Sequence, residues 1–228
     1  MASTWWRIGP ALAEGGWRVH AVDLPGHGRA PRLTGTFSLE RFAALTAERL
    51  PERIDLLVGH SLGALVALMV AARRLRSVRA LVLEDPPDAL PHAGRPVGAE
   101  PAADRDAALR SFRALNPKWA EEDVRYAVDA ALAADIAGFE AALATRPRWD
   151  LAALVAAVGV PTAVLAPPSD TDGALSAARP FVRDLVGRDR FVEIDCGHCA
   201  HRACPDLWLQ AVTGFADAVI PPPRPGIE

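Results

Sequence analysis

The stretch LLVGHSLGAL, residues 56–65, decides the fold of this chain. The apolar run Ile54–Val58 is typical of a buried strand, and an apolar helical run continues to about Ala72. Between them lies the pattern Gly-x-Ser-x-Gly, from Gly59 to Gly63. A strand, a sharp turn and a helix in this order are the context that a nucleophile elbow requires. The sequence therefore predicts a strained turn that lifts the hydroxyl of Ser61 clear of the sheet.

The residue after the serine has a predicted role of its own. Gly59 and Gly63 leave room at positions where side chains would collide, so the turn can be tight. The amide of Leu62 then lies at the N-terminus of the following helix, where backbone N–H groups are free and the helix dipole favours negative charge. We expect this amide to point to the position where an oxyanion would form.

Composition indicates one folded domain of ordinary character. The chain has 228 residues and 50% hydrophobic content, enough for a sizeable core. Its net charge is -3 and its pI is about 6.1, and its basic residues are scattered Arg with a single Lys118. This balance argues against a nucleic-acid partner.

The sequence predicts a cytoplasmic protein without a membrane partner. Met1–Pro10 has no apolar signal-peptide core. The longest uncharged run, Leu151–Ser169, is split by Gly159 and Pro161 and does not read as a membrane span. Three cysteines lie within 196–204, and we expect them to be reduced thiols that serve as small packing residues.

Strands and helices alternate outside a central region. Short apolar or alternating runs predict strands at residues 18–23, 54–58, 78–83, 161–166 and 191–195, and helical patterns fill residues 5–13, 38–50, 174–186 and 205–219. This alternation predicts an α/β fold with a doubly wound, mostly parallel sheet whose sites lie at the carboxyl ends of its strands.

The central region is helical throughout and carries no strand signal. We place the sheet and its helices in residues 1–85 and 160–220, and a helical cap insertion in residues 86–159. Residues 221–228 are rich in Pro and form a loose tail.

A serine hydroxyl needs a base within hydrogen-bond reach, and the base needs an orienting carboxylate. After this kind of elbow the expected order along the chain is serine, acid, histidine. His92, His198 and His201 follow Ser61, and His198 lies in the loop after the last predicted strand. We therefore predict His198 as the base and a structural role for His201, bonding loop carbonyls.

The chain resembles the α/β-hydrolase family in three stretches. The resemblance rests on DLPGHG at residues 23–28, on VGHSLG at residues 58–63, and on Gly197-His198 followed by His201-Arg202 and Pro205. It covers nearly the whole chain and is specific for the fold, but weak for the substrate. It implies a catalytic triad in which Ser61 and His198 take two places.

The third place, the acid, is open between several carboxylates. The family usually carries it just past the strand after the cap, where Asp170 matches best by spacing and Asp172 second. Some members place it one strand earlier, which here means Asp85 or Glu84. We take Asp170 as the acid and keep Asp172 and Asp85 as alternatives.

One feature departs from the family pattern. Members begin with a strand and a His-Gly loop that supplies a second oxyanion amide, whereas here a helical pattern already begins at Thr4. Loss of one such donor typically costs about 100- to 1000-fold in turnover. The alternative to an active enzyme is therefore a weakened or inactive hydrolase-fold binding protein.

Neither a metal nor a cofactor is expected. Cysteine and histidine gather at residues 196–204, but structural zinc usually pairs two separated knuckles, and this chain offers one. His60 precedes the acid in the chain, so it does not fit the base, and we expect it to line the pocket beside Ser61.

The leading prediction is a serine hydrolase that acts on a small, mostly apolar ester or related acyl substrate. Lactone opening and C–C bond hydrolysis would use the same residues and stay open, as does the oligomeric state.

Overall fold

A parallel sheet of four strands forms the centre of the described molecule. The computed structural model describes residues 1–32, 38–88, 104–135, 149–169, 171 and 173–220. The strands are β1 (Arg53–His60), β2 (Ser77–Glu84), β3 (Thr162–Ala166) and β4 (Phe191–Glu193), in the order β1-β2-β3-β4. All pairs are parallel, as predicted for an α/β protein.

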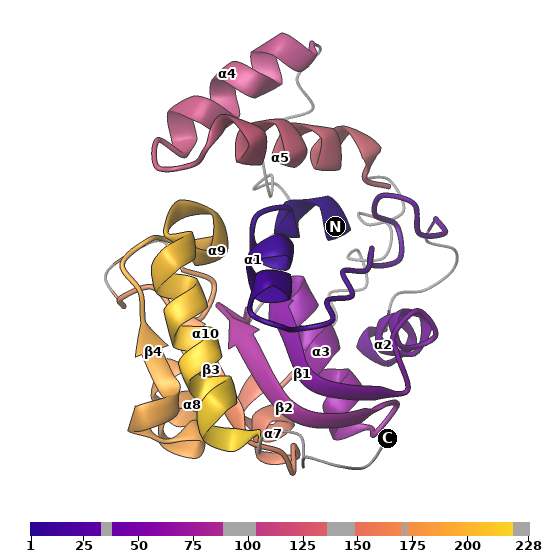
Figure 1. The fold of residues 1–228 in the computed structure, drawn as a ribbon, viewed down its shortest axis with the longest axis vertical. Coiled ribbons are helices and arrows are strands. Elements are labelled where there is room, and N and C mark those ends of the chain that lie inside the picture. The colour runs from indigo at the N-terminus through magenta and orange to yellow at the C-terminus, as the bar shows by residue number, and fades with distance from the viewer. Residues whose placement is uncertain (33–37, 89–103, 136–148, 170, 172, 221–228) are drawn as a thin grey trace.

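Helices cover both faces of this sheet (Figure 1). One face packs against α2 (Leu39–Ala47), α3 (Leu62–Ala72), α7 (Leu151–Ala156) and α8 (Arg179–Val186), and this is the larger apolar core. The other face packs against α1 (Ile8–Glu14) and α10 (Pro205–Val219) around the fully buried Trp208. The sheet is thus doubly wound, as the alternation of strands and helices indicated.

The remaining short elements are η1 (Ala2–Trp5), η2 (Arg188–Arg190) and α9 (Ala200–Ala203). The predicted helix at residues 5–13 is in fact η1 followed by α1. Among the described residues, no helix is both long and apolar enough to cross a membrane.

The strand predicted at residues 18–23 is wrong. The segment pairs with no other strand of the described chain, and Val19 is 39% exposed. A strand needs a partner for its N–H and C=O groups, and β1 has a described neighbour, β2, on one side alone. A turn fixes the end of the segment instead, since the Asp23 carboxylate accepts hydrogen bonds from the amides of Ala2 (2.8 Å) and Arg29 (3.0 Å).

Part of the predicted insertion projects from the sheet as a separate layer. Figure 1 shows α4 (Arg105–Leu115) and α5 (Glu121–Ala133) above η1 and α1. Buried Asp123 joins α5 to the N-terminal segment, because its carboxylate accepts hydrogen bonds from Trp6 Nε1 (2.8 Å) and the Arg7 guanidinium (3.2 Å). By contrast, α7 packs with α3 and α8 in the core.

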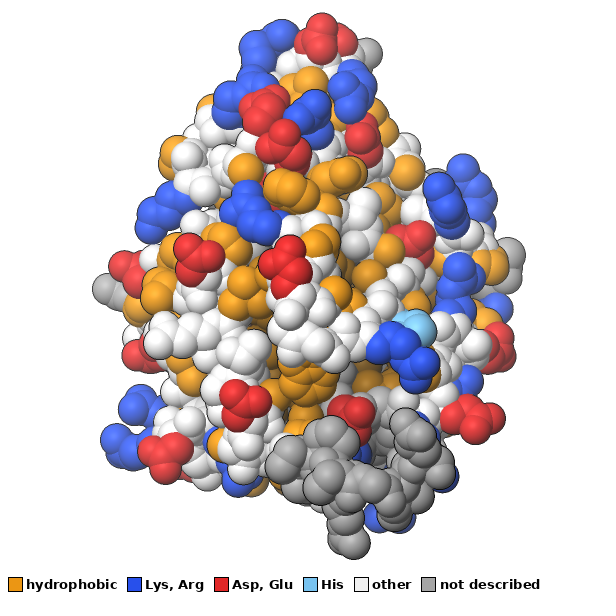
Figure 2. All heavy atoms as spheres, viewed as in Figure 1, with side chains coloured by type: hydrophobic (Ala, Val, Ile, Leu, Met, Phe, Trp, Pro, Cys, Tyr) orange, Lys and Arg blue, Asp and Glu red, His pale blue; other side chains and the backbone are white. Residues whose placement is uncertain are grey.

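The surface of this layer carries both charges and apolar groups (Figure 2). Ion pairs join Arg105 to Asp129 and Arg113 to Glu121, each at 2.6 Å. Leu115 remains 69% exposed, so an apolar surface coexists with the ion pairs.

The helix predicted at residues 174–186 is shorter than expected and begins at Arg179. Two carboxylates explain the difference. Asp85 accepts hydrogen bonds from the amides of Ala174 and Leu175, and Asp88 accepts them from those of Ser176 and Ala178. Because these amides bind carboxylates, the backbone wraps around the end of β2 instead of starting a helix.

Candidate active site

The predicted sharp turn is present at Ser61. Its backbone has φ 53° and ψ −124°, a conformation that non-glycine residues rarely adopt. The Ser61 amide donates to the Glu84 carbonyl at 2.9 Å, which ties the turn to the end of β2. Gly59 makes the turn possible, because a Cβ there would lie 2.6 Å from the Gly63 carbonyl carbon and 2.7 Å from Ala64 Cα.

Neither the Ser61 hydroxyl nor the Leu62 amide takes part in the hydrogen bonds that begin α3. The Ser61 hydroxyl does not cap α3, although the residue occupies the N-cap position. The first main-chain bonds of the helix run from Ala64 (2.8 Å) and Leu65 (3.4 Å) to the Ser61 carbonyl. The Leu62 amide is therefore one of the N-terminal donors that the helix itself does not use.

His198 forms a hydrogen bond with Asp85. Its Nδ1 lies 2.5 Å from Asp85 Oδ2. A carboxylate can only accept, so Nδ1 carries the proton and Nε2 of neutral His198 presents its lone pair. The Asp85 side chain is 1% exposed and that of His198 is 34% exposed, so the acid is buried while the imidazole reaches the surface of the site.

Two backbone amides fix the Asp85 carboxylate. Its carboxylate accepts hydrogen bonds from the amides of Ala174 (2.7 Å) and Leu175 (3.0 Å), and its backbone has φ 41°. A strained backbone conformation of this kind persists where the surrounding structure enforces it, often at functional sites. Asp85 was an alternative acid in the sequence analysis, whereas Asp170 and Asp172 lie outside the described residues.

The strand register explains why these groups meet. His60, the last residue of β1, pairs with Glu84, the last residue of β2. Ser61 and Asp85 therefore follow neighbouring strands at the same edge of the sheet, and the loop after β4 carries His198 to that edge. In the described structure no hydrogen bond joins the Ser61 hydroxyl to His198; such bonds are often long before substrate binds.

His60 supports the loop that carries His198. Its Nε2 lies 2.9 Å from the His198 carbonyl oxygen, and the two rings are 4.6 Å apart. Burial lowers the pKa of His60 well below its ordinary value of 6.5, so the ring is neutral and Nε2–H is the donor. From the sequence we expected His60 only to line the pocket, and no local pattern indicated this bond, whose partners are 138 positions apart.

A second carboxylate–imidazole pair lies beneath the first. Glu84 Oε1 accepts hydrogen bonds from the His201 amide (3.0 Å) and from His201 Nδ1 (2.9 Å), and both side chains are 1% exposed. Trp5 stacks on the His201 ring at 4.5 Å. His201 thus binds a carboxylate, not the loop carbonyls that the sequence analysis expected.

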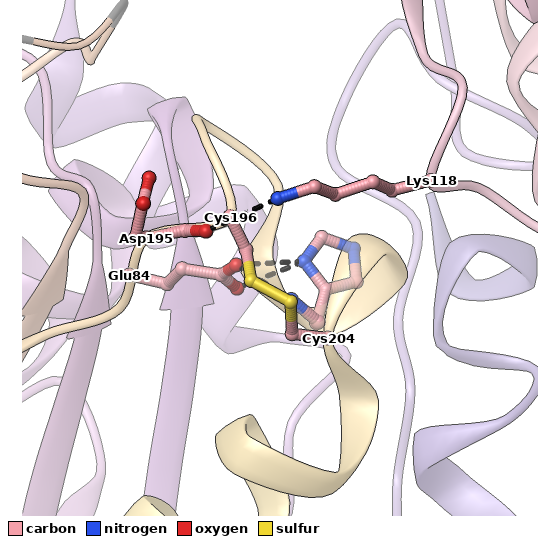
Figure 3. The surroundings of a disulfide bond; sticks show 6 residues. Glu84, Lys118, Asp195, Cys196 and Cys204 are labelled. Atoms are coloured by element: carbon pink, nitrogen blue, oxygen red, sulfur yellow. Dashed lines mark hydrogen bonds and ion pairs between the residues drawn. A yellow bond between two sulfur atoms is a disulfide. The ribbon is translucent and has the colours of Figure 1, made fainter.

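The expectation of three reduced thiols is wrong for two of them. Cys196 and Cys204 form a disulfide with their Cα atoms 6.1 Å apart, and it closes the loop that contains His198 (Figure 3). Cys199 is a free thiol beside His60, and burial raises its pKa to about 12. In Figure 3 Lys118 reaches the same loop and donates to the Asp195 carbonyl at 3.4 Å.

A group of potential metal ligands occurs among the described residues, although not in the cysteine-rich set considered from sequence. Donor atoms of His60, Glu84 and His201 lie within 4.8 Å of one another. Glu84 and His201 already use each other as hydrogen-bond partners, and His60 uses the His198 carbonyl. These bonds account for the arrangement without an ion.

Comparison with known proteins shows which family the chain belongs to. The profile of the alpha/beta hydrolase family matches residues 1–211. The chain belongs to this family. Two solved structures share the fold: a hydrolase from Pseudomonas aeruginosa PA01 (TM-score 0.71, 22% identity, 95% of this chain and 86% of that one) and E-2-(acetamidomethylene)succinate hydrolase (TM-score 0.71, 21% identity, 95% and 87%).

Curated relatives match over a shorter stretch. The pimeloyl-[acyl-carrier protein] methyl ester esterase of Neisseria meningitidis serogroup C is 44% identical over 95 residues, which cover 36% of this chain and 36% of the relative. An esterase of the same name from Sodalis glossinidius is 46% identical over 81 residues, 36% of this chain and 30% of that protein. The match thus spans about a third of the length of these relatives.

Proposed function

We propose that the chain is a serine hydrolase that cleaves small, mostly apolar esters with Ser61, His198 and Asp85. The hydrogen bond of 2.5 Å between His198 and Asp85 at the sheet edge that carries the Ser61 turn is the observation that supports this most. The proposed nucleophile, acid and base then follow β1, β2 and β4 of one sheet, in the chain order serine, acid, histidine. Asp85 takes the place that the sequence analysis gave to Asp170.

The reaction divides into two halves. Ser61 Oγ attacks the ester carbonyl while His198 Nε2 accepts the hydroxyl proton, and Asp85 stabilises the imidazolium through Nδ1–H. The Leu62 amide donates to the negative oxygen of the tetrahedral intermediate. His198 then gives its proton to the leaving alcohol, and an acyl-enzyme remains on Ser61.

Water completes the cycle. His198 Nε2 removes a proton from a water molecule, which attacks the acyl carbonyl, and the second tetrahedral intermediate collapses with Ser61 Oγ as leaving group. The proton returns from His198 to Ser61, so acid product leaves and the resting enzyme is restored.

Relatives favour esters over the other bonds that this machinery cleaves. The curated relatives are named as esterases that act on a methyl ester, and this supports a small alcohol as leaving group. We place lactone opening and C–C bond hydrolysis second, because none of these relatives is named for them.

Labelling with a fluorophosphonate probe tests the proposal. We expect stoichiometric labelling of wild-type protein at Ser61 and none in Ser61→Ala, while Ser77→Ala, a change at an exposed serine, labels like wild type. Labelling that persists in Ser61→Ala rejects the nucleophile. Absence of labelling in a folded wild type that still binds short-chain ester analogues supports the alternative, a hydrolase-fold binding protein.

A further inference from the structure

Glu84 contacts both elements that carry the proposed catalytic groups. Its main-chain carbonyl accepts the Ser61 amide at 2.9 Å. Its carboxylate accepts the His201 amide at 3.0 Å and His201 Nδ1 at 2.9 Å. The next residue, Asp85, binds His198. One residue at the end of β2 therefore fixes the turn of the nucleophile and the loop of the base.

The Glu84 carboxylate is unusual because charged side chains are rarely buried this completely. Glu84 is 1% exposed, and removing a charge from water costs several kcal/mol unless partners compensate. Burial alone would raise its pKa, but the electrostatic influence of the His201 and His60 rings and the hydrogen bonds from His201 outweigh burial and lower the pKa to about 2. Glu84 is therefore ionised, and its second oxygen, Oε2, also lies 2.9 Å from His201 Nδ1.

The loop of His198 is held at two points. His60 Nε2–H donates to the His198 carbonyl from β1, and Glu84 binds the amide of residue 201 from β2. Between these two points the loop makes its turn into α9, and the disulfide Cys196–Cys204 encloses both. Since the Asp85–His198 bond depends on where this loop lies, the anchors act on the imidazole through the backbone.

We infer that Glu84 is a positioning residue that sets the distance between His198 and both Ser61 and Asp85. This inference rests on the proposed function, because a position matters to turnover only if Ser61 and His198 react. The hydrogen bond to the main-chain amide at position 201 carries the effect, and the His201 imidazole adds to it.

Two conservative variants separate position from charge. Glu84→Gln keeps the length of the side chain and an oxygen that accepts the amide of residue 201, but loses the charge. Glu84→Asp keeps the charge but is one methylene shorter, so its oxygens no longer reach that amide. If Glu84 acts by positioning the loop, Glu84→Gln should preserve activity better than Glu84→Asp.

The experiment measures kcat and KM for a short-chain p-nitrophenyl ester on the full chain, together with the proton NMR signal of His198 Nδ1–H. We expect Glu84→Asp to lower kcat about 10- to 100-fold, as misplacement by about 1 Å does, with little change in KM. In the same variant the NMR signal should weaken. Glu84→Gln should stay within about fivefold of wild type and keep the signal.

The matched control is Asp123→Asn, a change at another buried carboxylate, 2% exposed, whose hydrogen bonds run to Trp6 and Arg7 of the N-terminal segment. It should lower the melting temperature without changing the His198 signal. Wild-type kcat in both Glu84 variants, or better activity in Asp than in Gln, overturns the inference. If wild-type protein is not labelled at Ser61, the proposed function fails instead, whatever the Glu84 variants do.

Discussion

At the scale of single residues, turnover should depend most on the proposed acid, Asp85. We expect Asp85→Asn to lower turnover about 10⁴-fold, because an amide cannot hold the His198 tautomer that accepts the serine proton. The measurement is kcat for a short-chain ester at neutral pH. Asp88→Asn is the matched control, since Asp88 also accepts hydrogen bonds from backbone amides, those of Ser176 and Ala178, whereas the described hydrogen bond of His198 Nδ1 goes to Asp85. If Asp170→Asn or Asp172→Asn loses activity while Asp85→Asn does not, the acid is Asp170 or Asp172 and not Asp85.

The pKa shifts of two side chains, His60 and Glu84, make stability depend on pH. The pKa of His60 lies well below 6.5 in the fold because of burial, so stability present above pH 6.5 is lost as the pH falls and the ring must be charged. The pKa of Glu84 falls from 4.5 to about 2. A carboxylate with a lowered pKa stabilises the fold above its unfolded value, so this contribution is lost between pH 4.5 and about 2.

Urea unfolding at a series of pH values measures both contributions. We expect the free energy of unfolding to fall in two stages, one beginning near pH 6.5 and one between pH 4.5 and about 2. Glu84→Gln should flatten the lower stage and His60→Gln the upper one. A wild-type curve that is level from pH 7 to pH 3 contradicts both assignments.

At the scale of elements, the disulfide closes the loop between β4 and α10. In the chain-entropy account a closed loop of this length, with Cys196 and Cys204 eight positions apart, contributes about 2 to 3 kcal/mol. We expect Cys204→Ser to lower the melting temperature and also kcat, because His198 lies inside the closed loop. Cys199→Ser should do neither, and Cys199 itself should resist alkylation in the folded chain, since its thiol has a pKa of about 12. Equal melting temperatures for Cys204→Ser and wild type would show that the loop needs no bond.

The same elements show what the sequence could and could not predict. Local patterns sufficed for the Ser61 turn and for the sheet, because a buried strand and an apolar helix each leave a clear period. They failed at residues 18–23, where the alternation is right for a strand but pairing is a long-range property. Spacing favoured Asp170 over Asp85, but spacing says nothing of which carboxylate the amides of Ala174 and Leu175 bind, and in the described structure that carboxylate is Asp85. The Glu84–His201 pair left no local signal, because its members are 117 positions apart.

At the scale of the whole molecule, the open side of β1 should limit stability. Strand β1 pairs with β2 on one side and with no described strand on the other, although its residues include Ile54, Leu56 and Val58. An unpaired edge exposes backbone donors and acceptors and invites association with other chains. A strand added there would pair its backbone and bury several apolar side chains, each contributing roughly 1.5 to 3 kcal/mol. That sum is comparable to the stability of about 5 to 15 kcal/mol that a whole domain has.

We therefore predict that the 228-residue chain is marginally stable and associates with rising concentration, and that it hydrolyses esters slowly because β1, which leads into the Ser61 turn, lies at this open edge. A chain extended at its N-terminus by a strand that pairs with β1 should melt well above it, remain monomeric and turn over substrate faster. Light scattering, thermal unfolding and ester hydrolysis compare the two, and an extension of equal length rich in Gly and Ser controls for length alone. The prediction is contradicted if the 228-residue chain unfolds cooperatively as a monomer and matches the extended chain in activity. The open side of β1 would then reduce neither stability nor turnover, and packing by η1, α1 and residues 18–23 would be sufficient to complete the sheet.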